Sequence, residues 1–328
     1  MKLHKNKDLF IDAVKITAQQ MNLPEIYIEK DYWITYALHI IFSNPIGEET
    51  IFKGGTALSK CFNLINRFSE DIDLVVSRKE GESDNKLKTK LKTISKIINS
   101  NLPEISDYDL THKRGMIRKT AHSYNKQFNG EYGQVRDAIV IEATWFGYYE
   151  PFTTKKVNSF VGDMMLNNGQ EEIAKEYDLL PFKLKVLEPT RTICEKIMSL
   201  VRFSYTDNPI DDLKNKVRHI YDLHMLLQHK EYLKFFNSKD FENMFLKVAN
   251  DDIKSFKNNN DWLNNHPKEA LIFSDLVKIW KELMPIYNTN FKSLTYNDFP
   301  DEIQIINTLR IIRTRITEIN WNINLNNK

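Results

Sequence analysis

The sequence contains few cysteines and no long hydrophobic segment. The 2 cysteines among its 328 residues, Cys61 and Cys194, fall on the apolar sides of predicted helices, and the chain has no zinc-ligand spacing. This pattern predicts buried thiols in a reducing compartment and excludes a disulfide scaffold. No apolar run reaches the roughly 18 residues that a membrane helix needs, and the first residues lack a signal-peptide core. We therefore expect a cytoplasmic protein without a membrane partner.

The sequence also lacks a strong excess of either charge. Its 46 lysines and arginines nearly balance 44 aspartates and glutamates, and a net charge of +2 neither requires nor excludes a nucleic-acid partner. One segment is uneven, because residues 110–130, here called the basic stretch, contain no acidic side chain. Its basic residues include Lys113, Arg114, Arg118, Lys119 and Lys126. The basic stretch is interpreted either as a solvated loop or as a surface that binds nucleic-acid phosphates.

Residues 50–76 follow the pattern strand, glycine turn, helix, strand. The apolar residues 51–52 precede Gly54 and Gly55, and from Thr56 onward apolar side chains recur at helical spacing. A helix that begins at a glycine turn points its unpaired backbone N–H groups and the positive end of its dipole outward. Because the glycines have no Cβ atom, a phosphate can approach the backbone closely. We therefore predict a phosphate-binding site at this turn.

Two carboxylates follow the predicted helix. Asp71 and Asp73 lead into the apolar residues 74–76, and the two-residue period of a strand places both on one face, roughly 7 Å apart at their Cα atoms. Such a pair can bind a hard cation such as Mg²⁺. An Asp-x-Asp sequence alone more often marks a solvated strand end, and it also occurs in Mn²⁺-dependent glycosyltransferases. Its position after a predicted phosphate-binding turn favours nucleotidyl transfer, which requires both features.

The chain contains four motifs, at residues 54–59, 67–74, 191–196 and 218–223. These motifs resemble those of the AbiEii/AbiGii-type nucleotidyltransferases. These proteins are toxins of bacterial toxin–antitoxin and phage-defence systems. The motifs appear in the order that the family has. The string Glu-Lys-Asp-Tyr-Trp at residues 29–33 extends the resemblance toward the N-terminus. These toxins belong to the polymerase-β-like nucleotidyltransferase superfamily.

The resemblance implies an α+β fold with a polymerase-β-like nucleotidyltransferase core, in which helices flank a small mixed sheet. An N-terminal helical layer would precede this core, and a C-terminal helical bundle would follow it. A chain of 328 residues with 41% hydrophobic residues suits two domains, here predicted as residues 1–188 and 189–328. Within residues 147–188 the sequence indicates loops, short helices and one strand at residues 182–187.

The resemblance also assigns roles to residues of the first motif. Asp71 and Asp73 would bind Mg²⁺ or Mn²⁺ and take part in catalysis, with a nucleoside triphosphate as the substrate. The residues expected to bind the nucleotide are Gly54, Gly55, Thr56, Ser59, Lys60, Arg67 and Ser69.

A third metal ligand is predicted on another strand. Residues 138–146 are rich in β-branched and aromatic side chains, and Glu142 carries the one charge among them. A lone carboxylate in such a strand is costly unless it is paired or bound to a metal, so Glu142 is a candidate for the third carboxylate of the superfamily. An ordinary ion pair and exposure to solvent are the alternatives. Some relatives carry Lys-x-Asp where this chain has Val140, Ile141 and Glu142.

The two later motifs fall on predicted helices. By helical spacing alone, Arg191 and Glu195 form an exposed ion pair, and Lys196 also lies outside the buried stripe. The resemblance instead makes Lys196 a catalytic residue and gives Asp222 the place of the aspartate in the last motif. Asp222 would then act as a base or hold Lys196 and Arg218 in place.

The resemblance implies transfer of a nucleoside monophosphate to the 3′ end of tRNA, which would block translation, and it implies a cognate antitoxin as partner. The basic stretch would supply the RNA-binding residues Lys113, Arg114, Arg118 and Lys119. Two other interpretations stay open, namely transfer to a hydroxyl of a protein or small molecule, and an idle module that binds RNA or an antitoxin. Because idle relatives usually lose the metal ligands, the presence of both aspartates favours an enzyme.

Overall fold

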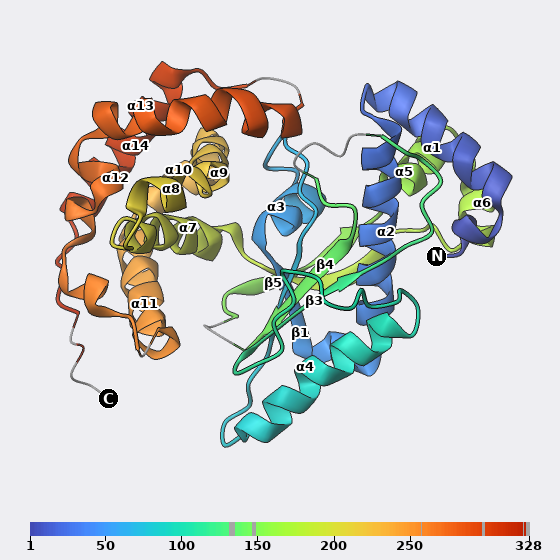
Figure 1. The fold of residues 1–328 in the computed structure, drawn as a ribbon, viewed down its shortest axis with the longest axis horizontal. Coiled ribbons are helices and arrows are strands. Elements are labelled where there is room, and N and C mark those ends of the chain that lie inside the picture. Colours follow the sequence, from blue (N-terminus) through green and yellow to red (C-terminus); the bar gives the residue numbers. More distant parts are fainter. Residues whose placement is uncertain (131–134, 146–148, 257, 297–298, 324, 326–328) are drawn as a thin grey trace. The chain divides into compact units, whose positions relative to one another are not determined.

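The structure is a computed structural model that describes residues 1–130, 135–145, 149–256, 258–296, 299–323 and 325. The chain forms two compact units (Figure 1). The first contains Met1–Asn63 and Phe68–Leu187, and the second contains Leu64–Arg67 and Glu188–Lys328. The short segment before the Asp-x-Asp motif therefore belongs to the second unit, an exchange that the sequence pattern does not indicate.

A mixed six-stranded sheet forms the core of the first unit. Its strands are β1 (Thr50–Lys53), β2 (Ile72–Val76), β3 (Ile117–His122), β4 (Ile139–Thr144), β5 (Phe152–Val157) and β6 (Phe182–Leu187). They lie in the order β3-β4-β2-β1-β6-β5. The pairs β1–β6 and β2–β4 are parallel, whereas the other neighbouring strands are antiparallel. This mixed sheet confirms the predicted α+β core.

The first unit also contains helices, of which the second, third and fourth along the chain pack against the sheet. They are α1 (Lys7–Met21), α2 (Glu25–Phe42), α3 (Gly54–Phe62), α4 (Asp84–Asn99), α5 (Phe160–Asn167) and α6 (Glu171–Glu176). α2 is buried around most of its circumference, as expected for a helix that is apolar on nearly all sides. α4 contacts β2, β3 and β4, while α3 contacts β1, β2, β5 and β6. α1 and α2 form the predicted N-terminal helical layer.

The strands predicted around residues 51–52, 74–76, 138–146 and 182–187 are observed, whereas β3 and β5 were not predicted. The strand predicted at residues 138–146 is observed as β4, and Phe146 lies outside the described residues. β6 has the predicted bounds. β5 was not predicted, because most of its side chains are exposed and no alternating apolar pattern marks it. Pairing of its backbone with β6 along its whole length stabilises this edge strand.

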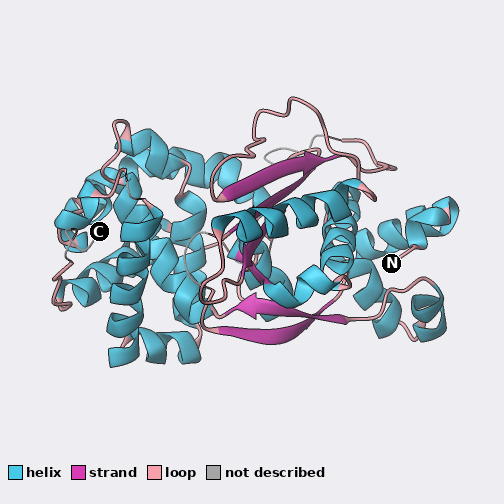
Figure 2. Cartoon of the chain, turned by 90° about the horizontal axis from the view of Figure 1, so that it is seen from below, coloured by secondary structure: helices cyan, strands magenta, loops and turns pink. Residues whose placement is uncertain are grey.

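The second unit is built from helices (Figure 2). They are α7 (Pro189–Phe203), α8 (Pro209–Lys214), α9 (Val217–Gln228), α10 (Lys230–Phe236), α11 (Lys239–Ser255), α12 (Leu271–Ser274), α13 (Leu276–Ile286) and α14 (Glu302–Thr317). A capping box begins α14, in which Asp301 and Gln304 exchange side-chain-to-backbone hydrogen bonds. These helices confirm the predicted C-terminal bundle. In the described parts of both units, no helix combines the length and apolarity that a membrane crossing demands.

Candidate active site

A row of four charged side chains crosses the sheet of the first unit. Lys119 on β3, Glu142 on β4, Asp73 on β2 and Lys53 on β1 are successive register partners. Register partners on neighbouring strands project from the same face of a sheet. The four side chains therefore follow one another in the order positive, negative, negative, positive. Two adjacent carboxylates lie at the centre of this row.

Asp73 lies against the beginning of α3. Gly54, the first residue of that helix, has φ +81°, and a Cβ atom built on it would lie 2.1 Å from Oδ2 of Asp73. The absent side chain of Gly54 therefore makes room for the Asp73 carboxylate, whereas the sequence predicted that it makes room for a phosphate. The carboxylate lies beside the N-terminus of α3, where the helix dipole favours negative charge.

Burial and neighbouring negative charges disfavour the ionised form of Asp73. Burial, followed by the negative charges of Asp71 and Glu142, raises the pKa of Asp73 to about 7. A pKa raised in this way means that the folded protein disfavours the ionised carboxylate unless a cation compensates it. Asp71 and Asp73 are thus close enough to repel each other, which is the electrostatic condition of a cation site.

The donor atoms suit a Mg²⁺-type ion that is shared with a nucleotide. Such ions are usually held by one or two carboxylates together with substrate phosphates, not by a full set of protein ligands. Asp71 and Asp73 provide this pair. Among the described residues, no group of three or more His, Cys, Asp or Glu side chains is arranged to hold a metal ion. Glu142, the predicted third ligand, is the register partner of Asp73, and its Oε2 lies 2.9 Å from Nζ of Lys119 in an ion pair, so its role as a metal ligand stays a prediction.

Two hydroxyl side chains predicted to bind the nucleotide have contacts within the protein instead. The Thr56 hydroxyl donates to the backbone oxygen of Asp71 at 2.6 Å and lies 3.0 Å from Oγ of Ser69. Thr56 is buried, so these contacts connect α3 firmly to the segment that carries Asp71. Phosphate binding at this turn would therefore use backbone N–H groups of the first turn of α3, which have no partner within a helix.

Lys60, a further predicted nucleotide ligand, is an internal ion-pair residue. Its ammonium group pairs with Asp31 of α2, and each side chain is only 4% exposed. The other oxygen of Asp31 accepts a hydrogen bond from the backbone N–H of Phe160 at 2.8 Å. Lys60 and its neighbour Ser59 also line a pocket of about 630 Å³ beside α5. Lys60 therefore joins α2, α3 and α5, which explains part of the Glu-Lys-Asp string of residues 29–31.

Lys196 and Asp222 meet in the second unit. Nζ of Lys196 is 2.8 Å from Oδ2 of Asp222, and Arg67 donates from Nε and Nη2 to the two oxygens of Asp222 at 2.7 and 2.8 Å. Lys196 is 6% exposed, so the exposed position predicted from helical spacing is wrong. Arg67, which was predicted to bind the nucleotide, thus contacts both carboxylate oxygens of Asp222 in the structure.

The charges of this cluster are mutually dependent. Burial alone would raise the pKa of Asp222, but the positive charges of Arg67 and Lys196 lower it well below its usual range. Burial, followed by the charge of Lys196, lowers the pKa of His219, whose Nδ1 lies 3.2 Å from Nζ of Lys196. Asp222 is therefore ionised and His219 neutral. An aspartate with so low a pKa is a poor general base, which favours its holding role.

The Arg191–Glu195 pair exists but is not exposed as predicted. Nε of Arg191 lies 2.9 Å from Oε1 of Glu195, and its Nη2 lies 2.7 Å from Oδ2 of Asp251 on α11. Arg191 is 1% exposed, because α11 packs against this side of α7. Helical spacing within α7 could not reveal a partner on a distant helix.

The basic stretch does not form one free surface. Arg118 and Lys119 are adjacent on β3, so they point to opposite faces of the sheet. Nε of Arg118 donates to Oγ of Ser95 at 2.6 Å, and Lys119 is ion-paired with Glu142. Arg114 is exposed, and the side chain of Lys113 is 38% exposed.

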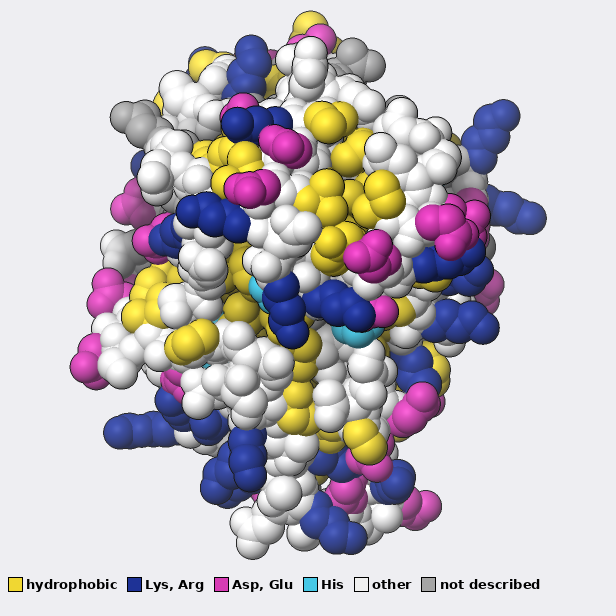
Figure 3. All heavy atoms as spheres, turned by 90° about the vertical axis from the view of Figure 1, so that its right-hand side faces the viewer, with side chains coloured by type: hydrophobic (Ala, Val, Ile, Leu, Met, Phe, Trp, Pro, Cys, Tyr) yellow, Lys and Arg dark blue, Asp and Glu magenta, His cyan; other side chains and the backbone are white. Residues whose placement is uncertain are grey.

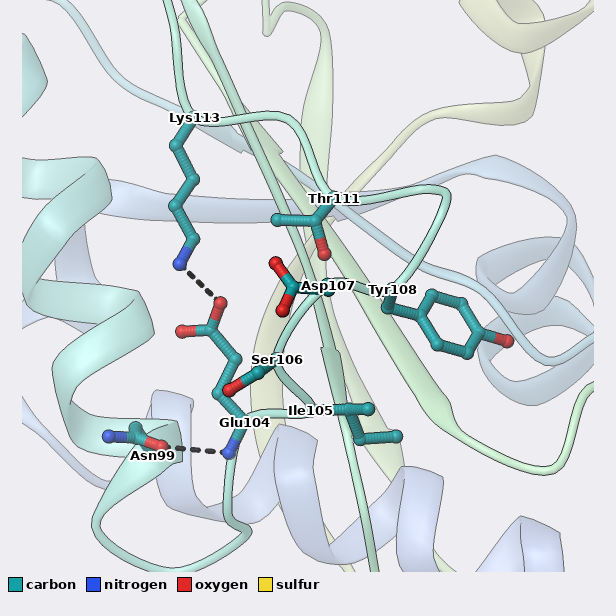
Figure 4. A pocket seen from close by; sticks show the side chains of 8 residues that line it. All are labelled: Asn99, Glu104, Ile105, Ser106, Asp107, Tyr108, Thr111 and Lys113. Carbon is teal, nitrogen blue, oxygen red and sulfur yellow. Dashed lines mark hydrogen bonds and ion pairs between the residues drawn. The ribbon is translucent and has the colours of Figure 1, made fainter.

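Lys113 lines a pocket of about 730 Å³. This pocket lies apart from the candidate cation site, since neither Asp71 nor Asp73 lines it. Figure 4 shows Lys113 extending toward Glu104, with which it forms an ion pair. Positive charge does not dominate the face of the molecule drawn in Figure 3 either, where lysines and arginines are interspersed with acidic side chains. Within the basic stretch, Arg114 and Lys113 are therefore the predicted RNA-binding residues that face solvent.

Two arginines contact the predicted catalytic aspartates, and one of them, Arg136, lies at a position that no sequence pattern indicates. Arg67 binds Asp222, as described above. Nη1 of Arg136 lies 2.6 Å from Oδ1 of Asp71. Each arginine is distant from its aspartate in the sequence, and no local motif marks Arg136, so only the folded chain reveals these contacts.

A mixed sheet with an Asp-x-Asp motif at the start of one strand, beside a helix that begins at a glycine, is consistent with a nucleotidyltransferase-type fold. The profile of the family described as nucleotidyl transferase AbiEii toxin, type IV TA system, matches residues 39–300. The chain therefore belongs to this family of toxin-type nucleotidyltransferases, as the sequence motifs indicated. Membership implies a nucleoside triphosphate substrate and an antitoxin partner. No curated protein matches the chain in a sequence comparison.

Proposed function

We propose that the protein transfers a nucleoside monophosphate from a nucleoside triphosphate to the 3′-terminal hydroxyl of tRNA and thereby blocks translation. The hydroxyl oxygen attacks the α-phosphorus, the bond from this phosphorus to the bridging oxygen breaks, and pyrophosphate leaves while the hydroxyl proton passes to solvent. The observation that carries the proposal is the position of Asp73, near Asp71 and against Gly54 at the beginning of α3. It combines a cation-binding pair with a helix N-terminus suited to phosphates.

The residues divide the work of this reaction. When bound, Mg²⁺ or Mn²⁺ supplies charge neutralisation at the phosphates and activation of the attacking hydroxyl. Asp71 and Asp73 hold the cation, and the backbone N–H groups of Gly55 and Thr56 bind the β- and γ-phosphates at the N-terminus of α3. Lys196 is required because a fixed cation stabilises the charge of a transferring phosphoryl group.

Asp222 acts as the residue that positions Lys196. Its contacts with Arg67 and Lys196, together with its lowered pKa, support this role over that of a base. An antitoxin neutralises the activity, as the toxin family implies, and defence against phage is the proposed biological setting. The reaction takes place in the cytoplasm, where tRNA and nucleoside triphosphates are present.

A transfer assay with labelled nucleotides tests the proposal. The full-length protein is incubated with each of the four α-³²P-labelled nucleoside triphosphates, Mg²⁺ or Mn²⁺, total RNA and total protein. We expect label at the 3′ end of tRNA, and we expect the Asp73→Asn variant to lose it. Label on protein or on small molecules would show that one of these, and not tRNA, is the acceptor. Binding of RNA without any transfer would establish the idle module instead.

A further inference from the structure

A buried lysine on α2 anchors the segment that enters β4. Lys30 has no exposed surface, and its ammonium group donates to the backbone oxygens of Arg136 and Ala138, each at 2.5 Å. The same group lies 3.2 Å from Oε2 of Glu70, which is itself 4% exposed. Taking two such charges out of water costs several kcal/mol per ion before their attraction offsets it. Holding a loop with a buried pair of this kind therefore requires a large desolvation free energy.

Glu70 continues the network from Lys30 toward Asp71. Both of its carboxylate oxygens accept the backbone N–H of Arg136, at 3.0 and 2.8 Å. Nη1 of Arg136 lies 3.4 Å from Oε1 of Glu70 and 2.6 Å from Oδ1 of Asp71. The backbone and the side chain of Arg136 are thus fixed by the same carboxylate. The chain of contacts Lys30, Glu70, Arg136, Asp71 ends at a residue of the proposed cation site.

An apolar pair of equal volume would pack the interior at least as well as Lys30 and Glu70 do. It could not present an arginine to Asp71 in a fixed orientation. The side chains of Arg136 and Asp71 are 30% and 32% exposed, so the network runs from the protein interior to a site that solvent and substrate can reach. Carboxylates that bind metals are generally oriented by hydrogen bonds from outer residues, and loss of such a partner weakens metal binding.

We propose that Arg136 is a positioning residue for the cation site, which holds Oδ1 of Asp71 so that this carboxylate is oriented to bind the divalent ion, and that Glu70 and Lys30 hold Arg136 in place. This inference rests on the proposed function, because it assumes that Asp71 and Asp73 bind the ion. Arg136 acts through Asp71 and takes no part in bond making or breaking.

Manganese binding to the full-length protein tests the inference without nucleotide or acceptor. We would titrate Mn²⁺ by isothermal calorimetry and by electron paramagnetic resonance into the wild type and the variants Arg136→Gln, Arg136→Lys and Glu70→Gln. Arg136→Gln should bind Mn²⁺ about 10–100-fold more weakly. Arg136→Lys, which can still donate to Asp71, should retain most of the affinity. Arg310→Gln, at an exposed arginine of α14, is the matched control and should bind as the wild type does.

The kinetics of nucleotide transfer should show the same dependence on Arg136. Raising the Mn²⁺ concentration should restore the transfer rate of Arg136→Gln toward that of the wild type, because the variant lacks orientation of a ligand and retains the ligand itself. Unchanged or tighter Mn²⁺ binding by folded Arg136→Gln would overturn the inference. The Asp73→Asn variant distinguishes failure of the inference about Arg136 from failure of the proposed cation site itself. If it binds Mn²⁺ as the wild type does, or if the wild type binds none, the proposed cation site fails together with the inference.

Discussion

The guanidinium group of Arg67 donates to both carboxylate oxygens of Asp222, which lies 155 residues further along the sequence. Arg67 belongs to the segment Leu64–Arg67, which precedes the Asp-x-Asp motif and is part of the second unit. The ion pair therefore fixes the end of a segment that continues directly into the candidate active site. Lys196 shares the same carboxylate, at 2.8 Å. Asp222 thus neutralises two buried cations at once.

Replacement of Asp222 should destabilise the fold. In Asp222→Asn the cations of Arg67 and Lys196 would stay buried without their anion, and breaking a buried pair in this way costs about 3–5 kcal/mol. We expect a fall of this size in the free energy of unfolding, measured by urea denaturation. The matched control is Asp211→Asn, at an aspartate whose side chain is 75% exposed, which should change the free energy by less than about 0.5 kcal/mol. Equal effects of the two variants would contradict the assignment.

A methyl group at position 54 should disturb the active site more than one at position 81. Gly54 and Gly81 both have positive φ values, +81° and +72°, so alanine strains the backbone at each. A Cβ atom at Gly54 would lie 2.1 Å from Oδ2 of Asp73, whereas at Gly81 nothing lies within 4 Å. Both variants should lose about 1–3 kcal/mol of stability, and Gly54→Ala alone should abolish transfer. Equal transfer activity in the two variants would show that Asp73 does not depend on the space at Gly54.

Neutralisation of Asp73 should separate stability from activity. Because burial and the charges of Asp71 and Glu142 raise the pKa of Asp73 to about 7, its ionised form is disfavoured in the protein without metal. In EDTA at pH 8, Asp73→Asn should therefore unfold with a free energy about 1–2 kcal/mol higher than that of the wild type. Transfer should fall by about 10³-fold or more, since a metal ligand is removed. A destabilised Asp73→Asn protein would argue that the carboxylate has a structural role.

Acid should destabilise the protein through His219. Burial and the charges of Lys196 and Lys216 lower the pKa of His219, while the charge of Asp222 opposes this shift. The unfolded chain binds a proton near pH 6.5, but the folded chain does not, so the free energy of unfolding falls as the pH decreases below about 6.5. In His219→Asn, the fall in the free energy of unfolding between pH 6.5 and pH 5 should be smaller by about 1–2 kcal/mol.

The control for this pH dependence is His229→Asn, because His229 is an exposed histidine at the end of the same helix. Urea denaturation of the wild type and both variants at several pH values provides the comparison. The prediction would be wrong if His219→Asn and the wild type lost stability in parallel on acidification.

Local sequence patterns were sufficient for much of the fold and for the centre of the site. The glycine turn, the apolar residues after Thr56 and the apolar residues after Asp73 each depend on near neighbours in the chain, so their periodicity predicted α3 and β2. β6 was predicted for the same reason. β5 was missed because its backbone pairing with β6, and not burial of its own side chains, determines its structure.

The contacts of side chains with distant partners were not predicted. Lys196 was predicted to be exposed because helical spacing describes only its own helix, while its partner Asp222 lies on α9. Lys60 was assigned to the nucleotide because its motif lies next to the glycine turn, although Asp31 of α2 holds it. Charge pairs between elements far apart in sequence leave no periodic signal, so the sequence could not predict these contacts.

The exposed residues Lys113 and Arg114 of the basic stretch should bind RNA, and the half-buried Arg118 should not. Lys113→Gln combined with Arg114→Gln removes the two solvent-facing cations and should weaken tRNA binding, with the slope of log K against log salt reduced by roughly 0.7–0.9 for each phosphate that is no longer neutralised. Arg118→Gln is the matched control, since Ser95 holds that arginine, and it should leave the slope unchanged. Filter binding of tRNA at salt concentrations between about 50 and 200 mM measures both. Equal slopes for all three proteins would return the basic stretch to a solvated loop.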